Sequence, residues 1–171
     1  MWALQQLGGA LSLVADADDL SEALTGYEQA YQISFARHTL ALLGLQDGPD
    51  LHADLVFLQT FYGWMTETSA SWPQVFFDWF GGEASSDRAA QSPLSKLYQA
   101  DAFKPVRDGL YARTPDRAAR LSHAYFQKPA PVDLVIDTVE SLWAPIADDD
   151  NWSAFEGTLA DIEQARLAYL G

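Results

Sequence analysis

Apolar side chains recur through most of this chain at alternating steps of three and four residues, the spacing that places them on one face of an α-helix. The longest such stripe consists of Leu20, Leu24, Tyr27, Tyr31, Phe35, His38 and Leu42. Gly44 follows it, at a position where glycine commonly ends a helix. No Asn-Gly or Asp-Gly pair separates runs of alternating apolar residues, so β-hairpins have no comparable signal. The sequence therefore predicts an all-α fold with no sheet.

Three helices are expected near the start of the chain. An uncapped apolar stripe beginning at Met1-Trp2 predicts a helix over about residues 2–15, as in a chain cut from something larger. Asp19 or Ser21 is the expected cap of the second helix, and the turn Gly48-Pro49-Asp50 is expected to cap the third. The short loops between these helices predict an up-down-up array.

The segment Trp72–Phe80 is apolar on almost every side and is closed by a glycine pair. A helix of this kind is normally buried, so the favoured interpretation is a plug in the centre of the core. The alternative is an exposed docking patch formed by Trp72, Phe76 and Trp79. The following stretch, Glu83–Gln91, is rich in alanine and serine and is expected to be a flexible loop.

The rest of the chain is expected to add further helices. The pairs Ser92-Pro93 and Thr114-Pro115 each look like a cap followed by a proline in the first helical turn. Later helices are expected to begin at Pro129-Ala130-Pro131 and after the acidic run 148–151. These elements predict one domain, an irregular bundle of about seven to eight helices. Its expected parts are a three-helix array at 1–66, a plug helix and loop at 67–91, and C-terminal helices at 92–171.

Charge is unevenly distributed along the chain, whose net charge is −14. Residues 1–86 contain one basic side chain and eleven acidic ones, and residues 129–171 contain one and nine. Residues 87–128, called the basic island here, contain eight basic and four acidic side chains. Either the island packs against the chain's own carboxylates, which we favour, or it faces a phosphate-bearing or acidic partner. Nucleic-acid binding is not expected, because an acidic protein repels nucleic acid at long range.

The basic island and the aromatic segment supply the candidate interaction residues. They are Arg107, Arg113, Arg117, Arg120 and His123, with Trp72, Phe76 and Trp79. Arg113, Arg117 and Arg120 would share a helix face only if the helix continued through Pro115, where a break is expected. A stand-alone helical module that docks a protein partner through either surface is one functional alternative.

The motifs of catalysis and metal binding are missing from the sequence. The glycine pairs lack the further glycine and lysine of a nucleotide loop, and no Glu-x-x-His is present for a di-iron site. The acidic run 148–150 departs from a calcium loop, because Trp152 and Ser153 stand where a ligand and the turn glycine belong. No catalytic, cofactor-binding or metal-binding residue is therefore predicted. An enzyme using bundle carboxylates on a small molecule is kept as a third alternative, because helical cores can hold pockets.

Targeting and redox signals are also missing. No apolar run approaches the roughly 20 residues that cross a bilayer, and the first residues do not resemble a signal peptide. We therefore expect no membrane partner and a cytoplasmic location. Because the sequence contains no cysteine, disulfides and thiol chemistry are excluded.

Two stretches resemble a known family. The first contains Trp2-Ala3-Leu4 to Leu13, then Tyr27-Glu28-Gln29-Ala30-Tyr31 to Leu43-Gly44-Leu45, then Asp50 and Asp54. The second contains residues 120–126, 136–147 and 150–153. The first resembles the region after the kinase-like core in the SelO family of protein adenylyltransferases, and the second is similar to the C-terminal end of a bacterial branch of that family. The resemblance covers nearly the whole chain through apolar spacing, but Leu43 replaces the family's usual lysine and its arginine-asparagine pair has no clear counterpart after Pro131.

The resemblance implies a part in transferring AMP from ATP to protein hydroxyl groups. In the family the kinase-like core holds the ATP with Mg or Mn, and its catalytic motifs have no matching positions here. We therefore expect a C-terminal helical lobe that supports the core, with no cofactor and no transferase activity of its own. The expected partners are that core, in cis or as a separate chain, and the family's protein substrates. The helix of Trp2 and part of the aromatic segment are expected to pack against the core.

Overall fold

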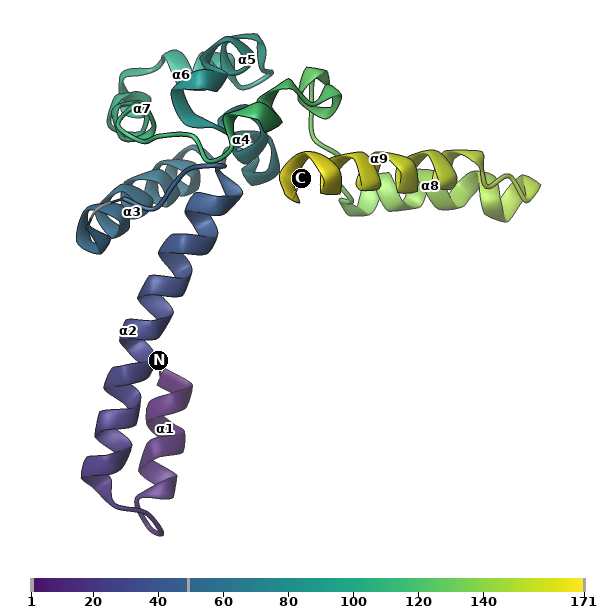
Figure 1. Ribbon diagram of the computed structural model, residues 1–171. Coiled ribbons are helices and arrows are strands. Elements are labelled where there is room, and N and C mark those ends of the chain that lie inside the picture. The colour runs from purple at the N-terminus through teal and green to yellow at the C-terminus, as the bar shows by residue number, and fades with distance from the viewer. Residues whose placement is uncertain (1, 49, 171) are drawn as a thin grey trace.

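The computed structural model describes residues 2–48 and 50–170, and most of them are helical (Figure 1). Met1, Pro49 and Gly171 lie outside the described residues, so the predicted start of the first stripe and part of the predicted turn do too. In the described ranges the only β-type pairing is an isolated antiparallel bridge between Leu45 and Pro115. The predicted all-α class is confirmed.

The described residues form nine α-helices and four short 3-10 helices. The α-helices are α1 (Trp2–Leu11), α2 (Ala17–Leu42), α3 (Leu51–Thr68), α4 (Trp72–Asp78), α5 (Ser86–Gln91), α6 (Ser95–Gln99), α7 (Lys104–Tyr111), α8 (Ile136–Asp149) and α9 (Ser153–Leu170). The 3-10 helices are η1 (Gly82–Ser85), η2 (Asp101–Phe103), η3 (Ala118–Ser122) and η4 (Ala124–Gln127). The number of elements exceeds the expected seven to eight because the middle of the chain is divided into short helical turns.

The start of α2 differs from its prediction. The Asp16 carboxylate accepts hydrogen bonds from the backbone N–H groups of Asp18 (2.8 Å) and Asp19 (3.4 Å), so Asp16 is the N-cap. The prediction of Asp19 or Ser21 as the cap is wrong. Asp19 lies in the first turn instead, where its negative charge interacts favourably with the helix dipole.

Two predicted helix ends are confirmed. Gly44 adopts a φ of +62°, and its N–H donates to the carbonyl of Ala41 (3.0 Å) after the last turn of α2. The Asp50 carboxylate accepts hydrogen bonds from the N–H groups of His52 (3.1 Å) and Ala53 (3.3 Å) and caps α3. Local capping chemistry therefore fixes where the long N-terminal helices stop and start.

Most buried side chains belong to two hydrophobic clusters that share the Trp72–Phe80 segment. The larger cluster joins the end of α2 to α3, α6 and α7, and it contains Val75 and Trp79. The smaller cluster joins η4 to the end of α9, and it contains Phe77 and Phe80. From Gln74 onward the segment is therefore largely buried between both clusters, as the plug interpretation expects.

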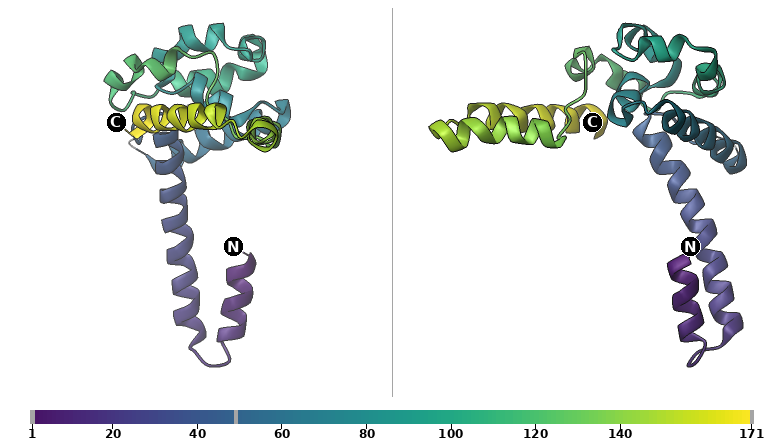
Figure 2. Two further views of the ribbon diagram at one scale, coloured as in Figure 1. Left: turned by 90° about the vertical axis from the view of Figure 1, so that its right-hand side faces the viewer. Right: turned by 180° about the vertical axis from the view of Figure 1, so that it is seen from behind.

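Two helical arms project from the body that the clusters form (Figures 1 and 2). One arm is the hairpin of α1 with the first half of α2, and the other is the hairpin of α8 with α9. Helices α1 and α3 lie against different parts of α2 (Figure 1). The described part of α1 contains no buried residue, and the buried residues of α2 begin only at Ala36. The array is consequently open.

The stretch Glu83–Gln91 is helical, forming η1 and α5, so the prediction of a flexible loop is wrong. Ala89 is buried, and the Ser85 hydroxyl donates to the backbone carbonyl of Phe80. Arg88 donates to the same carbonyl (2.8 Å) and to the Ser85 hydroxyl (2.9 Å). Contacts of these side chains with the body therefore order a segment whose composition alone suggested a loop.

Thr114-Pro115 does not begin a helix, which corrects a second prediction. The pair lies beside the segment that follows α2, where Gln46 donates its N–H to the carbonyl of Thr114 (3.0 Å). Asp116 donates its N–H to the carbonyl of Gly44 (2.7 Å). Proline has no N–H of its own, so it fits an isolated pairing that uses the backbone groups on either side.

Two other helices begin later than expected. The Ser92 hydroxyl accepts the N–H of Leu94 (3.0 Å) in a turn, and α6 starts only after it. Beyond Pro131 the chain stays non-helical until α8, and the N–H of Val132 donates to the hydroxyl of the buried Tyr125 (3.1 Å). In both places a side-chain hydroxyl holds the backbone outside the helix.

Gly109 of α7 packs against Phe57 of α3, and a Cβ at this position would overlap the Phe57 ring. We expect Gly109→Ala to lower the free energy of unfolding by about 1–3 kcal/mol, because overpacking forces the two helices apart. Gly26→Ala in α2, where a Cβ would have no neighbour within 4 Å, should instead raise it by about 0.5–1 kcal/mol. Urea denaturation followed by circular dichroism measures both effects. Unchanged stability of Gly109→Ala would contradict this helix contact.

Candidate functional site

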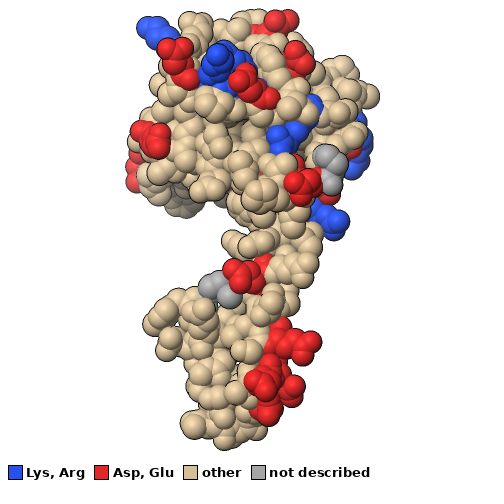
Figure 3. Space-filling view, turned by 90° about the vertical axis from the view of Figure 1, so that its left-hand side faces the viewer, with Lys and Arg blue, Asp and Glu red and all other residues tan. Residues whose placement is uncertain are grey.

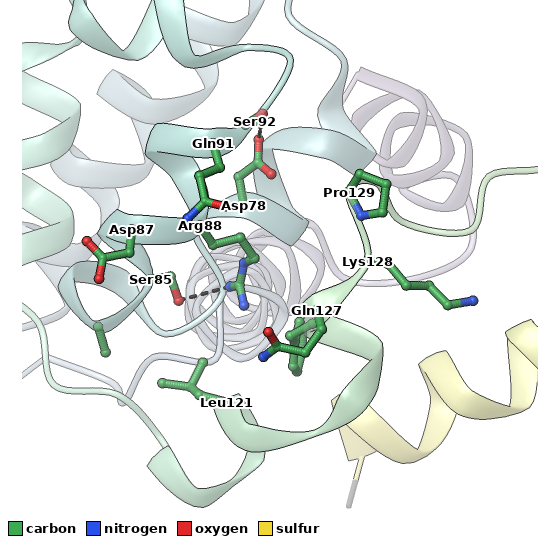
Figure 4. A pocket seen from close by; sticks show the side chains of 12 residues that line it. Asp78, Ser85, Asp87, Arg88, Gln91, Ser92, Leu121, Gln127, Lys128 and Pro129 are labelled. Atoms are coloured by element: carbon green, nitrogen blue, oxygen red, sulfur yellow. Dashed lines mark hydrogen bonds between the residues drawn. The ribbon is translucent and has the colours of Figure 1, made fainter.

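A polar cleft of about 390 Å³ lies between the α4–α5 segment and the η3–η4 segment (Figure 4). Its charged and amide side chains are Asp78, Asp87, Arg88, Gln91, Gln127 and Lys128. The stretches 78–92 and 121–129 are brought together by the smaller hydrophobic cluster. None of these six side chains is among the interaction residues predicted from the sequence.

Arg88 lies in the middle of the cleft (Figure 4). Its guanidinium carbon is 5.2 Å from the ring centre of Phe77 and 4.8 Å from that of Phe126, so it makes cation–π contacts with both rings. One terminal nitrogen is engaged by the Phe80 carbonyl and the Ser85 hydroxyl, whereas the buried Nε has no hydrogen-bond partner among the described residues. Burial lowers the pKa of Arg88, yet an arginine remains charged at neutral pH.

Asp78 is a buried carboxylate at the end of α4, with an exposed fraction of 1%. Three side chains donate to it: the Ser92 hydroxyl, the Tyr98 hydroxyl (2.7 Å) and the Gln74 amide (2.8 Å). Burial raises the pKa of Asp78, while these hydrogen bonds and the charge of Arg88 act in the opposite direction. Burial, together with the Asp78 charge, also raises the pKa of Tyr98. Asp78 thus holds α4 to the turns around it.

Lys128 forms the edge of the cleft nearest α9. Its ammonium group lies 2.6 Å from the Asp161 carboxylate of α9, and both side chains are partly exposed. The same ammonium group is 6.0 Å from the ring centre of Tyr125. Burial raises the pKa of Tyr125, and the Tyr125 hydroxyl accepts a hydrogen bond from the N–H of Val132. The edge of the cleft therefore also ties the α9 arm to the body.

The polar side chains of the cleft are bonded mainly to one another and to the backbone. The hydroxyls of Ser85 and Ser92 donate to a backbone carbonyl and to a carboxylate, and neither is paired with a histidine base. In the part of the chain that the structure describes, no group of three or more histidine, aspartate or glutamate side chains could hold a metal ion. The charged groups mainly stabilise the junction between α4, α5 and η4.

Arg113, a predicted interaction residue, is turned inward. Its guanidinium lies 2.9 Å from the Asp54 carboxylate, and the two side chains are only 12% and 5% exposed. The guanidinium also donates to the carbonyl of Gly109 (2.8 Å) and lies 3.9 Å from the ring centre of Phe57. This part of the basic island packs against the chain's own carboxylates, which is the interpretation that we favoured.

The other predicted basic residues are distributed over separate places. Arg120 donates to the last two described carbonyls of α9 (2.7 and 2.8 Å), and the Nδ1 atom of His123 accepts a backbone N–H in η4 (3.1 Å). Arg107 is half-buried on α7, and Arg117 is exposed. The structure does not bring Arg113, Arg117 and Arg120 onto one face.

The three predicted aromatic candidates also separate. Trp79 is 3% exposed and belongs to the core, so it does not contribute to a surface. Trp72 is 47% exposed and packs against Tyr62, with 5.1 Å between the ring centres. Phe76 is half-buried against Phe61, with 5.4 Å between the ring centres. Only Trp72 and part of Phe76 reach the surface of this segment.

Extensive apolar surfaces lie on the two arms. On the α1–α2 arm, Trp2, Leu13 and Val14 are 74%, 87% and 84% exposed. Figure 3 shows carboxylates along one edge of this arm, while lysines and arginines on the same face gather over the body. On the α8–α9 arm, a shallow groove of about 260 Å³ lies between the two helices. No described helix combines the length and hydrophobicity that a bilayer span needs.

The polar cleft had weak signals in the sequence. Asp78 interrupts an otherwise apolar run, and a carboxylate in a buried helix must find hydrogen-bond donors. Arg88 is the one basic residue among the small side chains of Glu83–Gln91. Neither signal identifies the partners of these residues, some of which are near in sequence, such as Gln74 and Ser85, whereas Phe126 is far away along the chain.

The buried ion pair predicts unequal roles for two arginines. Arg113→Met should lower the free energy of unfolding by about 3–5 kcal/mol, because it leaves the Asp54 carboxylate buried without its counter-ion. Arg117→Met removes only a surface pair with Asp116, at 64% and 41% exposure, and should change stability by less than about 1 kcal/mol. Urea denaturation at pH 7 measures both changes. Equal effects would show that Arg113 is not buried as described.

Asp78 predicts a pH dependence of stability. A carboxyl group whose pKa is raised by folding stabilises the folded state fully below its ordinary pKa of 3.8, and this contribution is lost as the pH rises through the folded-state pKa. The stability of Asp78→Asn relative to the parent protein should therefore increase from pH 4 upward. Denaturation at several pH values measures the difference, and Asp87→Asn is the exposed control from the same cleft. A difference that decreases with pH would contradict the assigned shift.

Comparison with known proteins identifies the family of this chain. The family described as protein adenylyltransferase SelO matches residues 1–163, which is nearly the whole chain. No curated protein and no solved structure matches it. The matched range includes the α1–α2 arm, the polar cleft, the two stretches that carry the resemblance, and the α8–α9 arm up to residue 163. This chain belongs to the SelO family of protein adenylyltransferases.

Proposed function

We propose that this chain is a helical lobe that packs against the kinase-like core of a SelO-type adenylyltransferase and supports it without transferring AMP itself. The observation that carries the proposal is the apolar surface of the α1–α2 arm. Trp2, Leu7 and Leu13 expose 74%, 53% and 87% of their surface there. Burying such surface is worth about 25 cal/mol per Å², so a protein partner that covers it gains substantial binding energy.

A row of aromatic rings continues this surface along α2. The ring centres of Tyr27 and Tyr31 are 6.2 Å apart, and those of Tyr31 and Phe35 are 6.3 Å apart. Tyr27 and Tyr31 are about half exposed, and they belong to the stretch that resembles the region after the family's core. Amphipathic aromatic rings are enriched where proteins bind one another. The arm is therefore the favoured contact with the core.

The charged groups of the cleft support a structural role. Nucleotidyl transfer requires cations that converge on the phosphates of the nucleotide. Arg88 donates a hydrogen bond to the Phe80 carbonyl and makes cation–π contacts with two aromatic rings. Asp78 accepts hydrogen bonds from three side chains. These contacts commit both groups to holding the body together. Binding of ATP and of its Mg or Mn ion is accordingly assigned to the core of the family.

The proposal is tested by adding this chain to the kinase-like core of a SelO protein from which the equivalent region has been removed. Isothermal titration calorimetry should detect association. Incorporation of labelled AMP into a protein substrate, with ATP and Mg or Mn, should increase when the two chains are mixed. The chain alone should incorporate none, and AMP transfer by it would overturn the proposal.

Two matched variants show which arm makes the contact. Trp2→Ala should weaken association with the core about tenfold. Trp2 would be buried in the complex, and loss of its side chain should remove at least about 1.4 kcal/mol of binding free energy. Trp143→Ala removes an equally prominent tryptophan, 62% exposed, from the other arm and should leave the affinity within about twofold. Equal affinities for the parent protein and Trp2→Ala would contradict docking through the α1–α2 arm.

A further inference from the structure

The α8–α9 arm carries an apolar groove that the proposed function does not use. Its walls are Val139, Leu142 and Trp143 of α8 with Phe155, Leu159 and Ile162 of α9. The groove measures about 260 Å³ and is open to solvent, with Trp143 and Leu159 62% and 49% exposed. An apolar surface of this kind is typical of a protein-binding site.

The arm that carries this groove is acidic. Residues 133–163 contain nine aspartates and glutamates and no lysine or arginine. Glu140 stands three residues before Trp143, and Glu156 stands three residues before Leu159, so each is a helix-surface neighbour of a groove residue. These two positions, which do not line the groove itself, are called its rim here. Outside the groove, Asp161 is paired with Lys128 and Glu163 with Arg166.

We propose that this groove binds a basic amphipathic helix of a protein partner. Apolar side chains spaced three and four residues apart on such a helix would fill the groove, as in other helix-in-groove complexes. Lysines or arginines beside them would meet Glu140 and Glu156 on the rim. Because α8 has 14 residues and is therefore about 21 Å long, it matches a partner helix of roughly four turns.

The charge of the arm disfavours other occupants. A second copy of this chain would bring the same excess of carboxylates into the contact, and like charges placed together oppose association. Nucleic acid and anionic lipid surfaces carry the same sign of charge as the arm. A basic helix is the occupant that satisfies both the apolar walls and the acidic rim.

The test uses the full chain and a labelled 18-residue probe peptide. The probe consists of leucine and lysine, with leucines at helical spacing. Fluorescence anisotropy should show saturable binding of this probe. Two control peptides, one with glutamate in place of lysine and one with glutamine in place of leucine, should bind at least about tenfold more weakly, because each lacks one of the two required features.

Variants of the two arms locate the site. Trp143→Ala should weaken probe binding about tenfold, whereas Trp2→Ala on the other arm should change it less than twofold. Because Trp143 is exposed, its replacement should leave the helical content unchanged by circular dichroism. The double variant Glu140→Gln/Glu156→Gln should bind several-fold more weakly at low salt, and this difference should shrink at about 0.5 M salt, where charges are screened. Glu22→Gln/Glu28→Gln on α2 is its matched control.

Three results with the peptides and variants would overturn the proposal, and a fourth comes from vesicles. The first three are binding of the glutamate peptide as tight as that of the probe, equal losses in Trp143→Ala and Trp2→Ala, and a dimer in sedimentation equilibrium that Trp143→Ala dissociates. Preferential binding to anionic vesicles would overturn it as well. The outcome is separate from that of the proposed function, because association with the core is measured through Trp2 and the probe through Trp143.

Discussion

The packing of the Trp72–Phe80 segment between two hydrophobic clusters is the interaction on which the body of this protein depends. Helix α4 has seven residues, and a helix this short is unstable in water by itself. Val75 and Trp79 are buried in the larger cluster, while Phe77 and Phe80 are buried in the smaller one. One aromatic segment therefore holds α3 and α7 on one side and the end of α9 on the other. The short helices around it persist because it gives them a surface to pack on.

The long N-terminal helices and two of their ends were predictable because their signals are local. The stripe of α2, Gly44 and the Asp50 cap can all be recognised within a few residues. The turns of Glu83–Gln91 and the pairing of Thr114-Pro115 could not be predicted, since they depend on contacts with Phe80 and with the segment after α2. The polar cleft escaped prediction for the same reason: its walls are distant in sequence and meet only after the smaller cluster forms.

Apolar periodicity indicates which helix face is apolar, and charge counts indicate which segment is basic or acidic. Neither indicates whether that face or segment is covered by the rest of the chain or exposed to solvent. The stripe from Leu20 to Leu42 is continuous, yet Tyr27 and Tyr31 are about half exposed on an arm and Leu42 is 57% exposed at its end. The buried residues of α2 are Ala36, Thr39 and Leu40, which do not belong to the stripe. The basic island likewise does not form one surface: its arginines have separate partners, such as Asp54 for Arg113. The proposed function assigns the exposed surface of the α1–α2 arm to contact with a kinase-like core.

The continuity of α2 has a mechanical consequence. This single helix of 26 residues, about 39 Å long, runs without interruption from the core, where Leu40 is fully buried, to the tip of the α1–α2 arm. A helix without a proline or other break resists bending, so it transmits displacement like a rod. Force applied at the tip therefore reaches Leu40 and the aromatic residues around it. A partner that binds this arm therefore also sets the orientation of the body relative to itself.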